Sequence, residues 1–330
     1  MTVDPRAFAG RRVLVTGGLG FIGSNLVRRL VDLQAEVAVL DCLAPEFGGN
    51  RFNLSGVEPQ IQIAVGDLRD ESLLAALLDR RDYLFNLAGQ SSHEGSMQDA
   101  YTDLEINAAG QLALLRLCRE KNPAIRIVYA GTRQVYGRPR YLPVDENHPL
   151  EPVDYNGVSK MAGEWYHLLS HRMDGLWTTN LRMTNVYGPR MRIRDARQMF
   201  MGWWLHQAVV GGEIPVFGTG QQIRDFNYVD DVVEALLLSV TEPSAAGQVF
   251  NLGGDEPVSL LDLARLIVEL NGGSYRLVDF PAERARIDIG DYTGDYTRAR
   301  MQLGWRPKVP LRDGLERTLA FYRKYKEHYF

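Results

Sequence analysis

Cysteine is scarce in this sequence, with only Cys42 and Cys118 among 330 residues. Neither belongs to a Cys/His spacing typical of a zinc site, so we interpret both as free thiols in a reducing compartment and predict no metal centre. Long hydrophobic runs are also absent. No window approaches the roughly 18 apolar residues of a membrane span, and residues 1–12 lack the apolar core of a signal peptide. We therefore expect a cytoplasmic protein without a membrane partner.

A surplus of positive charge is missing as well. The 37 Lys and Arg residues stand against 41 Asp and Glu residues, which gives a formal net charge of -4. This balance offers no attraction to a nucleic acid backbone or to an anionic membrane, so neither is an expected partner. The absence of internal repeats and low-complexity tracts argues against a repeat array or a disordered scaffold. With 45% hydrophobic residues, the chain is long enough for two packed globular units.

The first half of the chain alternates short apolar runs with stretches of helical periodicity, which is the pattern of consecutive βαβ units. We interpret as strands the runs at residues 12–16, 37–41, 61–66, 83–88, 125–130 and 177–182. The helical stretches lie near residues 23–33, 71–80, 98–120 and 157–172, and their lengths suit right-handed crossovers. The sequence therefore predicts a doubly wound, parallel, Rossmann-type α/β sheet.

The pattern changes after about residue 185. We expect an aromatic-rich helix at residues 198–210, which starts at Gln198 and carries Trp203 and Trp204 as core residues. Residues 228–253 contain a helix start and an apolar strand that indicate a return to the main sheet. The predicted larger domain is residues 1–185 plus about 226–255. A smaller, discontinuous α+β domain, about 186–225 plus 256–330, is expected to pack against it across a cleft.

The strongest local signal lies where the first strand runs into the first helix. Gly17, Gly20 and Gly23 are spaced three residues apart, with Phe21 and Ile22 before the last of them. Missing β-carbons permit a tight turn and a close backbone approach to a pyrophosphate, and the N–H groups at a helix start carry partial positive charge. A strand, a glycine turn and a helix in this register indicate a dinucleotide site.

Asp41 ends the second strand, 18 residues past Gly23. A carboxylate at that place accepts hydrogen bonds from an adenosine ribose diol and repels a 2′-phosphate, so NAD is favoured over NADP. Asp67 and Leu68 follow the third strand. We expect them to contact adenine, although an acidic residue at a strand end also serves as a plain helix cap.

Further motifs run nearly end to end through the chain. They are Gly66-Asp67-Leu68-Arg69-Asp70, Asn86-Leu87-Ala88-Gly89-Gln90, Asn107, Thr132 through Val135-Tyr136-Gly137, Ser159-Lys160-Met161-Ala162-Gly163-Glu164, Asn185-Val186-Tyr187-Gly188-Pro189-Arg190, Arg224-Asp225-Phe226 and Leu303-Gly304-Trp305. With these motifs the sequence resembles the NAD-dependent nucleotide-sugar epimerases and dehydratases of the extended short-chain dehydrogenase/reductase superfamily. The resemblance implies NAD in the larger domain and a nucleotide-sugar in the smaller one. The implied cofactor contacts also include Leu87, Ala88, Gly89, Asn107 and Lys160.

The resemblance further implies a homodimer, formed through a four-helix bundle of residues 98–118 and 157–170. The apolar side chains of these helices, which include Leu104, Leu112, Trp165 and Leu169, are more than one sheet face needs. Simple packing of both helices onto the sheet is the alternative.

By the same resemblance, Thr132 takes the place of the catalytic Ser/Thr, whose hydroxyl hydrogen-bonds the sugar oxygen that becomes a carbonyl. Lys160 takes the place of the lysine that binds the nicotinamide ribose and lowers the pKa of a neighbouring tyrosine. That tyrosine is missing, because Asn156 stands four residues before Lys160. An amide cannot serve as a general base near neutral pH, so the usual proton acceptor is lost.

Two residues are candidates to replace the tyrosine. Tyr155 is adjacent, but a one-residue shift at a helix start turns a side chain by about 100°. His93 follows the fourth strand and is expected to border the sugar, and histidine is a common acid/base near neutral pH. It would act alone or with Glu94. The alternative is a solvated loop histidine beside a surface carboxylate.

For the nucleotide-sugar, the resemblance points to Arg224 at the phosphate-binding place, with Arg284 or Arg286 on the other side, since arginine donors suit phosphate oxygens. Arginines in such a stretch are also often plain surface residues. The full set of expected substrate contacts is Gln90, Ser91, Thr132, Asn185, Arg224, Arg284, Arg286 and Asp288.

The dehydratase branch of the family commonly carries an acidic pair directly after the Ser/Thr, and here those places hold Arg133 and Gln134. The leading prediction is therefore an NAD-dependent epimerase that acts on a UDP-hexose or UDP-hexuronic acid through a keto-sugar intermediate. Two alternatives remain. One is a dehydratase that uses His93 and Glu94 as acid and base, and the other is an NAD- and nucleotide-sugar-binding protein without turnover.

Overall fold

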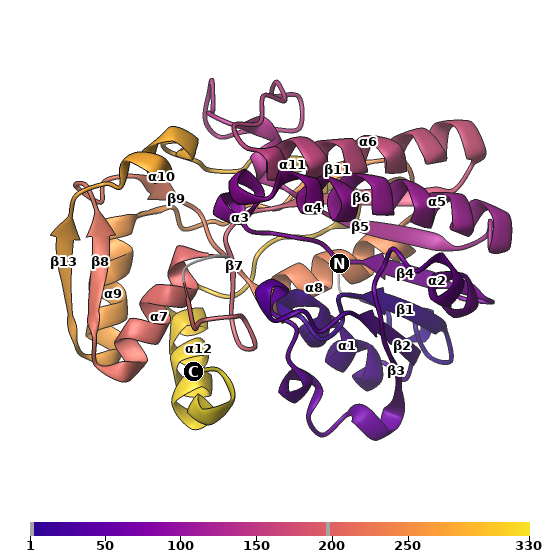
Figure 1. Cartoon of the computed structure of the whole chain (residues 1–330), viewed down its shortest axis with the longest axis horizontal. Helices are drawn as coiled ribbons and strands as arrows, with labels where there is room; N and C mark the ends of the chain where they lie inside the picture. The colour runs from indigo at the N-terminus through magenta and orange to yellow at the C-terminus, as the bar shows by residue number, and fades with distance from the viewer. Residues whose placement is uncertain (1–2, 196–198) are drawn as a thin grey trace.

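The computed structural model of the chain describes residues 3–195 and 199–330. A seven-stranded parallel sheet with the order β11-β6-β5-β4-β1-β2-β3 forms its centre (Figure 1). The strands are β1 (Arg12–Thr16), β2 (Glu36–Asp41), β3 (Ile61–Val65), β4 (Tyr83–Asn86), β5 (Arg126–Thr132), β6 (Trp177–Met183) and β11 (Val249–Asn251). The strand order reverses between β1 and β4, as in a doubly wound fold. The predicted Rossmann-type sheet is confirmed.

Helices cover both faces of this sheet. On one face, α1 (Phe21–Asp32) and α8 (Val229–Thr241) bury side chains such as Leu26 and Val233 against Val15 of β1. On the other, α2 (Glu71–Leu78) and α5 (Gly110–Lys121) bury Leu77 and Leu115, and α6 (Tyr155–Asp174) lies beside α5. Because apolar residues cover both faces of the sheet, the sequences of the central strands are nearly continuous hydrophobic runs.

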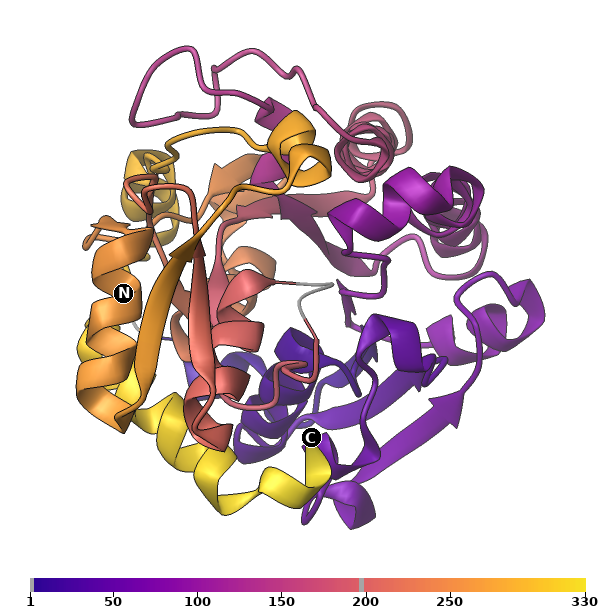
Figure 2. The same ribbon diagram turned by 60° about the vertical axis from the view of Figure 1, so that its left-hand side comes forward.

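A second apolar core lies to the left of the main sheet in Figure 1, and Figure 2 shows the same group of elements turned toward the viewer. It is built from α7 (Phe200–Val210), β8 (Glu213–Phe217), α9 (Leu260–Asn271), β13 (Ser274–Val278) and α12 (Leu311–Lys324), with β8 and β13 paired in parallel. The expected return to the main sheet is confirmed, because α8 packs on that sheet and β11 pairs with β6. The exact domain boundaries stay a prediction.

The remaining elements are short. They are α3 (His93–Gln98), α4 (Ala100–Leu104), α10 (Ala282–Ile287) and α11 (Thr297–Leu303), the strand pairs β7 (Val186–Tyr187) with β10 (Asn227–Tyr228) and β9 (Ile223–Arg224) with β12 (Val258–Ser259), and 3-10 helices at 5–7, 45–47, 51–54, 58–60, 133–136, 243–245 and 326–328. In the part of the chain that the structure describes, no helix has the length and apolar character to span a membrane.

Several predicted boundaries differ from the structure. The single helix expected at 98–120 is α4, a π-helical turn at residues 105–109 and α5. Helix α6 begins at Tyr155 rather than at 157, because the Asp154 side chain accepts a hydrogen bond from the Gly157 N–H and caps the helix. Strand β5 extends through Thr132, which is its last residue instead of following it. Helix α7 begins at Phe200, and Gln198 lies outside the described residues.

Candidate active site

The carboxyl ends of the central strands open into a first cavity of about 320 Å³. Parallel strands bring their carboxyl ends to one edge of a sheet, so residues far apart in sequence meet there. The residues of this cavity that the sequence singles out are Gly17, Gly20, Phe21, Ile22, Gly23, Asp41, Asp67, Leu68, Leu87, Ala88, Gly89, Ser91, His93, Thr132, Asn156 and Lys160. The first cavity therefore collects nearly all of the predicted cofactor contacts.

The glycine turn at one wall of the first cavity admits no side chain at its critical positions. Gly17 has φ of +70°, and a Cβ there would lie 2.9 Å from the backbone nitrogen of Ala88. A Cβ on Gly23 would lie 2.1 Å from the carbonyl oxygen of Gly17. Only glycine permits this close approach of β1, α1 and β4, and the first N–H groups of α1 face the cavity as an anion-binding site.

Asp41 stands at the end of β2 in the wall of the first cavity. Its carboxylate accepts hydrogen bonds from the backbone N–H groups of Leu19 (2.9 Å) and Leu43 (2.8 Å). Burial raises the pKa of Asp41, and these N–H donors oppose the rise. Asp67 also lines the cavity, where Arg69 hydrogen-bonds its carboxylate and holds its pKa below the usual range. Asp70, not Asp67, caps α2.

Lys160 lines the first cavity from the second turn of α6. Its ammonium Nζ is 3.4 Å from the Ala130 carbonyl and 5.3 Å from the centre of the Tyr129 ring. Burial lowers the pKa of Lys160 to about 8, although the charge of Asp103 opposes the shift. A Cβ on Gly89 would come within 2.6 Å of Nζ, so glycine at that position leaves room for the ammonium group.

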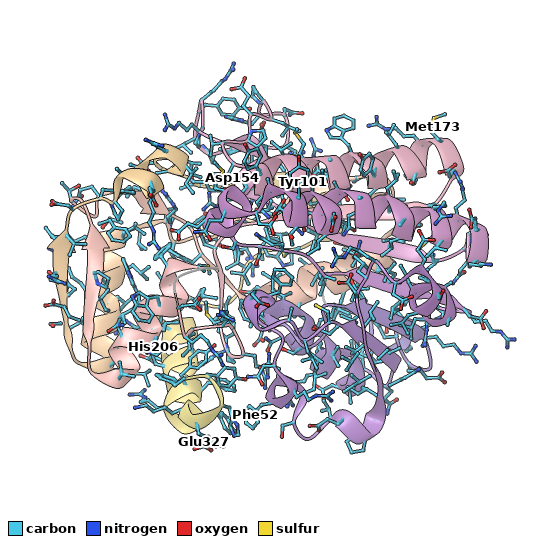
Figure 3. All side chains as sticks on the ribbon, in the orientation of Figure 1. Phe52, Tyr101, Asp154, Met173, His206 and Glu327 are labelled. Carbon is cyan, nitrogen blue, oxygen red and sulfur yellow. The ribbon has the colours of Figure 1, made fainter. Side chains whose placement is uncertain are left out.

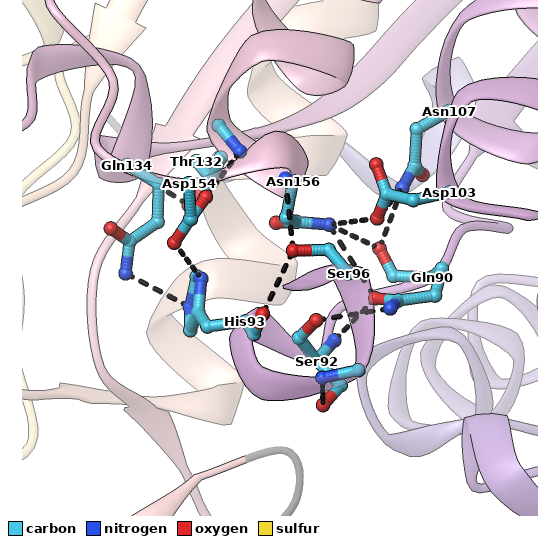
Figure 4. Close-up of polar contacts among 12 residues, drawn as sticks. Gln90, Ser92, His93, Ser96, Asp103, Asn107, Thr132, Gln134, Asp154 and Asn156 are labelled. Atoms are coloured by element: carbon cyan, nitrogen blue, oxygen red, sulfur yellow. Dashed lines mark hydrogen bonds and ion pairs between the residues drawn. The ribbon is translucent and has the colours of Figure 1, made fainter. Parts of the chain in front are cut away.

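Asn156, at the position where the resemblance implies a tyrosine, lines the same cavity. Figure 4 shows its polar contacts. Its amide nitrogen donates to the Gln90 carbonyl (2.9 Å) and to the buried carboxylate of Asp103 (2.9 Å). Both partners only accept, so the two N–H groups are used and the amide oxygen is the remaining polar atom. Asn107 donates to the same two acceptors and lies behind the cavity wall rather than in it.

His93 is the first residue of α3 and is 29% exposed in its side chain. Its Nδ1 lies 2.8 Å from the carboxylate of Asp154, and its Nε2 lies 2.9 Å from the side-chain nitrogen of Gln134 (Figure 4). Burial raises the pKa of Asp154, but the hydrogen bond and charge of His93, together with the Gly157 N–H, hold it below the usual range. The expectation of a solvated loop histidine is therefore wrong.

A second cavity of about 600 Å³ adjoins the first. His93, Thr132, Met183 and Met199 line both cavities, so the two spaces meet at these side chains. The hydroxyl oxygen of Thr132 accepts a hydrogen bond from the Gln134 backbone N–H at 3.2 Å, which leaves its own hydrogen to donate. Chemistry between a ligand in one cavity and a ligand in the other has to occur beside Thr132 and His93.

The second cavity is rich in arginine. Arg224 donates to the Ile223 carbonyl (2.9 Å), to the Gly290 carbonyl and to Asp288 (3.3 Å), and burial lowers its pKa to about 10. Arg284 pairs with Glu94 and lies 5.2 Å from the centre of the Phe217 ring. Asn185, Trp203 and Trp204 complete this part of the wall, so the two tryptophans, expected only as core, also face the cavity.

Some predicted site residues do not reach either cavity. Tyr155 is 51% exposed at the first position of α6, and the helix turns it away from the cavity wall that Asn156 forms. Arg286 is exposed on α10 and does not line the second cavity. Gln90 is buried behind the wall, where its carbonyl orients Asn156, and Ser91 faces the first cavity instead of the second.

Sequence reasoning missed two functional carboxylates, Asp103 and Asp154. The helix-capping role of Asp154 could have been predicted from the sequence, because an aspartate just before a helical stretch is typical of an N-cap, and its side chain accepts from the Gly157 N–H. The further contact with His93 joins residues 61 positions apart and leaves no trace in the local pattern. Asp103 sits on a helical stretch where a polar residue normally indicates a solvated face.

The chain is similar to known proteins over most of its length. The model of the NAD dependent epimerase/dehydratase family matches residues 13–253. A putative UDP-glucose 4-epimerase of Methanocaldococcus jannaschii is 32% identical over 93% of this chain and 97% of its own.

Two solved structures are similar over nearly the whole chain. The dTDP-glucose 4,6-dehydratase DesIV of Streptomyces venezuelae, with NAD and TYD bound, has a TM-score of 0.87 and 30% identity, and covers 96% of this chain and 98% of its own. A UDP-glucose 4-epimerase of Thermotoga maritima with UDP-glucose has a TM-score of 0.86 and 31% identity, and the match covers 95% of this chain and 99% of its own. Together these findings identify the cofactor as NAD.

A Gly17→Ala variant is expected to weaken NAD affinity by about tenfold or more, because alanine there adds left-handed strain and a clash with Ala88. Gly56→Ala is the matched control. Gly56 has φ of +88° but open space around it, so alanine adds the strain without a clash. Calorimetric titration of the NAD-free proteins measures the effect. Equal affinities of the two variants would contradict the proposed contact of the glycine turn with the cofactor.

Proposed function

This chain belongs to the NAD dependent epimerase/dehydratase family, and we propose that it is an epimerase that acts on a UDP-linked hexose or hexuronic acid. The observation that carries the proposal is the junction of two cavities at Thr132 and His93. One cavity has the walls of a dinucleotide site, and the other has the arginines and aromatic side chains that suit a nucleotide-sugar. A sugar carbon at the junction would lie between them.

NAD fits the first cavity. The β-carbon-free turn at Gly17 and Gly23 leaves room for a pyrophosphate, Asp41 is suited to a ribose diol, and Lys160 is suited to the nicotinamide ribose. When bound, NAD supplies the acceptor and then the donor of a hydride. Asp67, Leu68, Leu87, Ala88 and Gly89 would form the rest of the wall, with Asn107 supporting it from behind.

Thr132 would position the reacting hydroxyl of the sugar, because its oxygen accepts from Gln134 and its hydrogen is left to donate to the sugar oxygen. Removal of the hydroxyl proton needs a base. Asn156 has no basic atom, and its N–H groups are held by Gln90 and Asp103. Glu94 is paired with Arg284 and faces only the second cavity.

His93 is therefore the proposed base. The carboxylate of Asp154 only accepts, so Nδ1 of a neutral His93 carries the hydrogen and Nε2 carries the lone pair. Asp154 fixes this tautomer and would stabilise the imidazolium that forms when Nε2 takes the proton. The Gln134 amide, which donates to Nε2 here, would yield its place to the sugar hydroxyl. Asp154 is a positioning residue in this scheme.

Two observations favour epimerisation over dehydration. The positions directly after Thr132 hold Arg133 and Gln134, neither of which supplies a carboxylic acid to expel a hydroxyl group. Glu94, the acid that the dehydratase alternative would use, has its carboxylate engaged by Arg284. For the substrate, Arg224 and Arg284 would hold the diphosphate while Asn185 and Asp288 make polar contacts. Uracil as the base rests on the UDP-glucose-bound relative.

We also propose a homodimer through α4, α5 and α6. Tyr101 is 81% and Met173 is 79% exposed, and both are labelled on this side of the molecule in Figure 3. The apolar side chains exposed on the same helices are Tyr101, Leu104, Leu112, Val158, Trp165, Leu169 and Met173. Such a set along neighbouring helices is typical of a protein interface.

The first test is turnover. Purified protein that carries NAD is expected to convert one UDP-hexose, UDP-hexuronic acid or N-acetylated analogue into its epimer, with no change in mass, as followed by NMR and mass spectrometry. A product lighter by one water molecule would instead identify a dehydratase. Bound UDP-sugar with no product from any of these substrates would identify a binding protein without turnover.

The second test concerns His93. A His93→Asn variant, which keeps a donor toward Asp154 but has no basic nitrogen, is expected to lose about 10²- to 10⁴-fold in kcat. His171→Asn is the control, since His171 bonds to the Leu176 carbonyl and lines neither cavity. Added imidazole is expected to restore part of the activity of His93→Ala. An active epimerase whose His93 variants keep the full rate would rule out this base.

The third test is oligomeric state. The wild-type protein is expected to sediment with the mass of two chains, and Leu112→Glu with the mass of one, because a charge would be buried in the interface. Met301→Glu is the control, since Met301 is 75% exposed on α11, away from the three helices. A wild-type protein that stays at the mass of one chain at all concentrations would contradict the dimer.

A further inference from the structure

Arg133 has an unusual environment for a guanidinium group. It directly follows Thr132, opens the 3-10 helix Arg133–Tyr136 and lines the second cavity. Its Nη1 is shielded from solvent and has no hydrogen-bond partner, while its Nη2 makes a single long contact of 3.4 Å with the amide oxygen of Asn185. The ring of Tyr292 lies 4.9 Å below the guanidinium carbon. Most of the five N–H donors of this arginine are thus unused.

The other arginines around the site all have a carboxylate partner. Arg182 is buried against Glu164 with contacts of 2.9 and 2.5 Å, Arg224 pairs with Asp288, and Arg284 pairs with Glu94. Within residues 3–195 and 199–330, no carboxylate lies within ion-pair distance of Arg133. Arg133 is therefore the arginine of the second cavity whose charge no side chain of this part of the chain neutralises.

The buried carboxylate of Asp225 does not fill this role. Asp225 accepts hydrogen bonds from the hydroxyl of Thr184 (3.2 Å) and from the backbone N–H groups of Gly254 (3.2 Å) and Gly294 (2.9 Å). The charges of Asp225, Asp288 and Asp154 act on Arg133 without a direct contact. Burial, the dominant effect, lowers the pKa of Arg133.

A partly desolvated cation without an anionic partner is costly, and natural proteins keep such groups chiefly where a ligand neutralises them. The ligand must be anionic and must reach the second cavity beside Thr132. Consecutive Cα atoms lie about 3.8 Å apart, so Arg133 flanks the residue proposed to hold the reacting hydroxyl. Arg224 and Arg284 project from β9 and α10, which are elements separate from the β5 end that carries Arg133.

We propose that Arg133 binds a carboxylate on the sugar ring, so that the substrate is a nucleotide-linked hexuronic acid. This inference rests on the proposed nucleotide-sugar function. Two free N–H groups of a planar guanidinium match the two oxygens of a carboxylate, and the diphosphate already has Arg224 and Arg284. A neutral hexose would leave the solvent-shielded Nη1 of this partly buried guanidinium without a partner, which is the kind of mismatch that gives strong discrimination.

Direct binding measurements test the proposal without any need for turnover. The NAD-loaded protein is titrated calorimetrically with UDP-glucuronic acid, UDP-galacturonic acid, UDP-glucose, UDP-galactose and UDP. Wild-type protein is expected to bind a hexuronic acid about 10- to 100-fold more tightly than the matching hexose. Arg133→Met, similar in length but neutral, is expected to abolish this difference while leaving the affinity for UDP and for the hexoses unchanged.

Two further variants keep the outcome unambiguous. Arg133→Lys retains the positive charge but lacks the planar pair of N–H donors, and it is expected to keep part of the preference for hexuronic acids. Arg224→Met is expected to weaken UDP, hexose and hexuronic acid alike, because its proposed partner is the diphosphate.

Equal wild-type affinity for hexose and hexuronic acid would overturn the proposal. An Arg133→Met variant that loses as much affinity for UDP as for the hexuronic acid would also overturn it, since Arg133 would then bind the diphosphate. A clear preference for hexuronic acid without any product would support the carboxylate site and contradict the epimerase. Failure to bind any of these ligands would contradict both.

Discussion

The burial of the central sheet on both faces is the constraint on which the rest of this molecule depends. Because α1 and α8 cover one face and α2 and α5 the other, the strands offer polar groups to a ligand only at their ends. Asp41 ends β2, Thr132 ends β5, and the glycine turn follows β1. The parallel arrangement brings these ends to one edge, so the first cavity follows from the topology, and the second core closes it from the other side.

Asn156, at the place where the resemblance implies a tyrosine, belongs to a connected set of buried hydrogen bonds. Asp103 accepts from both Asn156 and Asn107, and the Gln90 carbonyl accepts from the same two amides. The buried charge of Asp103 also opposes the desolvation of Lys160. This arrangement holds the Asn156 amide, which does not titrate, at the place where the resemblance implies a tyrosine phenol. The base that we propose, His93, lies instead on α3, where Asp154 contacts its Nδ1.

Much of the fold and part of the site follow from the sequence because both depend on local pattern. Apolar periodicity predicts the strands and crossover helices, and the spacing of Gly17 and Gly23 predicts a turn that the structure shows to be closed to any β-carbon. Contacts between distant segments are not predictable in this way. The pairing of His93 with Asp154 requires α3 and the start of α6 to meet. The π-helical turn at 105–109 is equally hidden, because a polar Asn107 in a helical pattern indicates solvent rather than a buried amide.

The two residues after Thr132 connect the proposed proton transfer with the proposed specificity. In place of an acid pair, Gln134 reaches His93 and Arg133 faces the sugar cavity without a carboxylate partner in the described part of the chain. Without an acid at either position, the segment has no group that could protonate and expel a hydroxyl. With the cation of Arg133 there, a neutral sugar would leave a positive charge without an anionic partner. The same short segment would therefore suppress elimination, contact the base through Gln134 before the sugar binds, and select an anionic sugar. A dehydratase with this segment would need an acid from elsewhere, and Glu94, the candidate beside His93 in sequence, is already bound to Arg284.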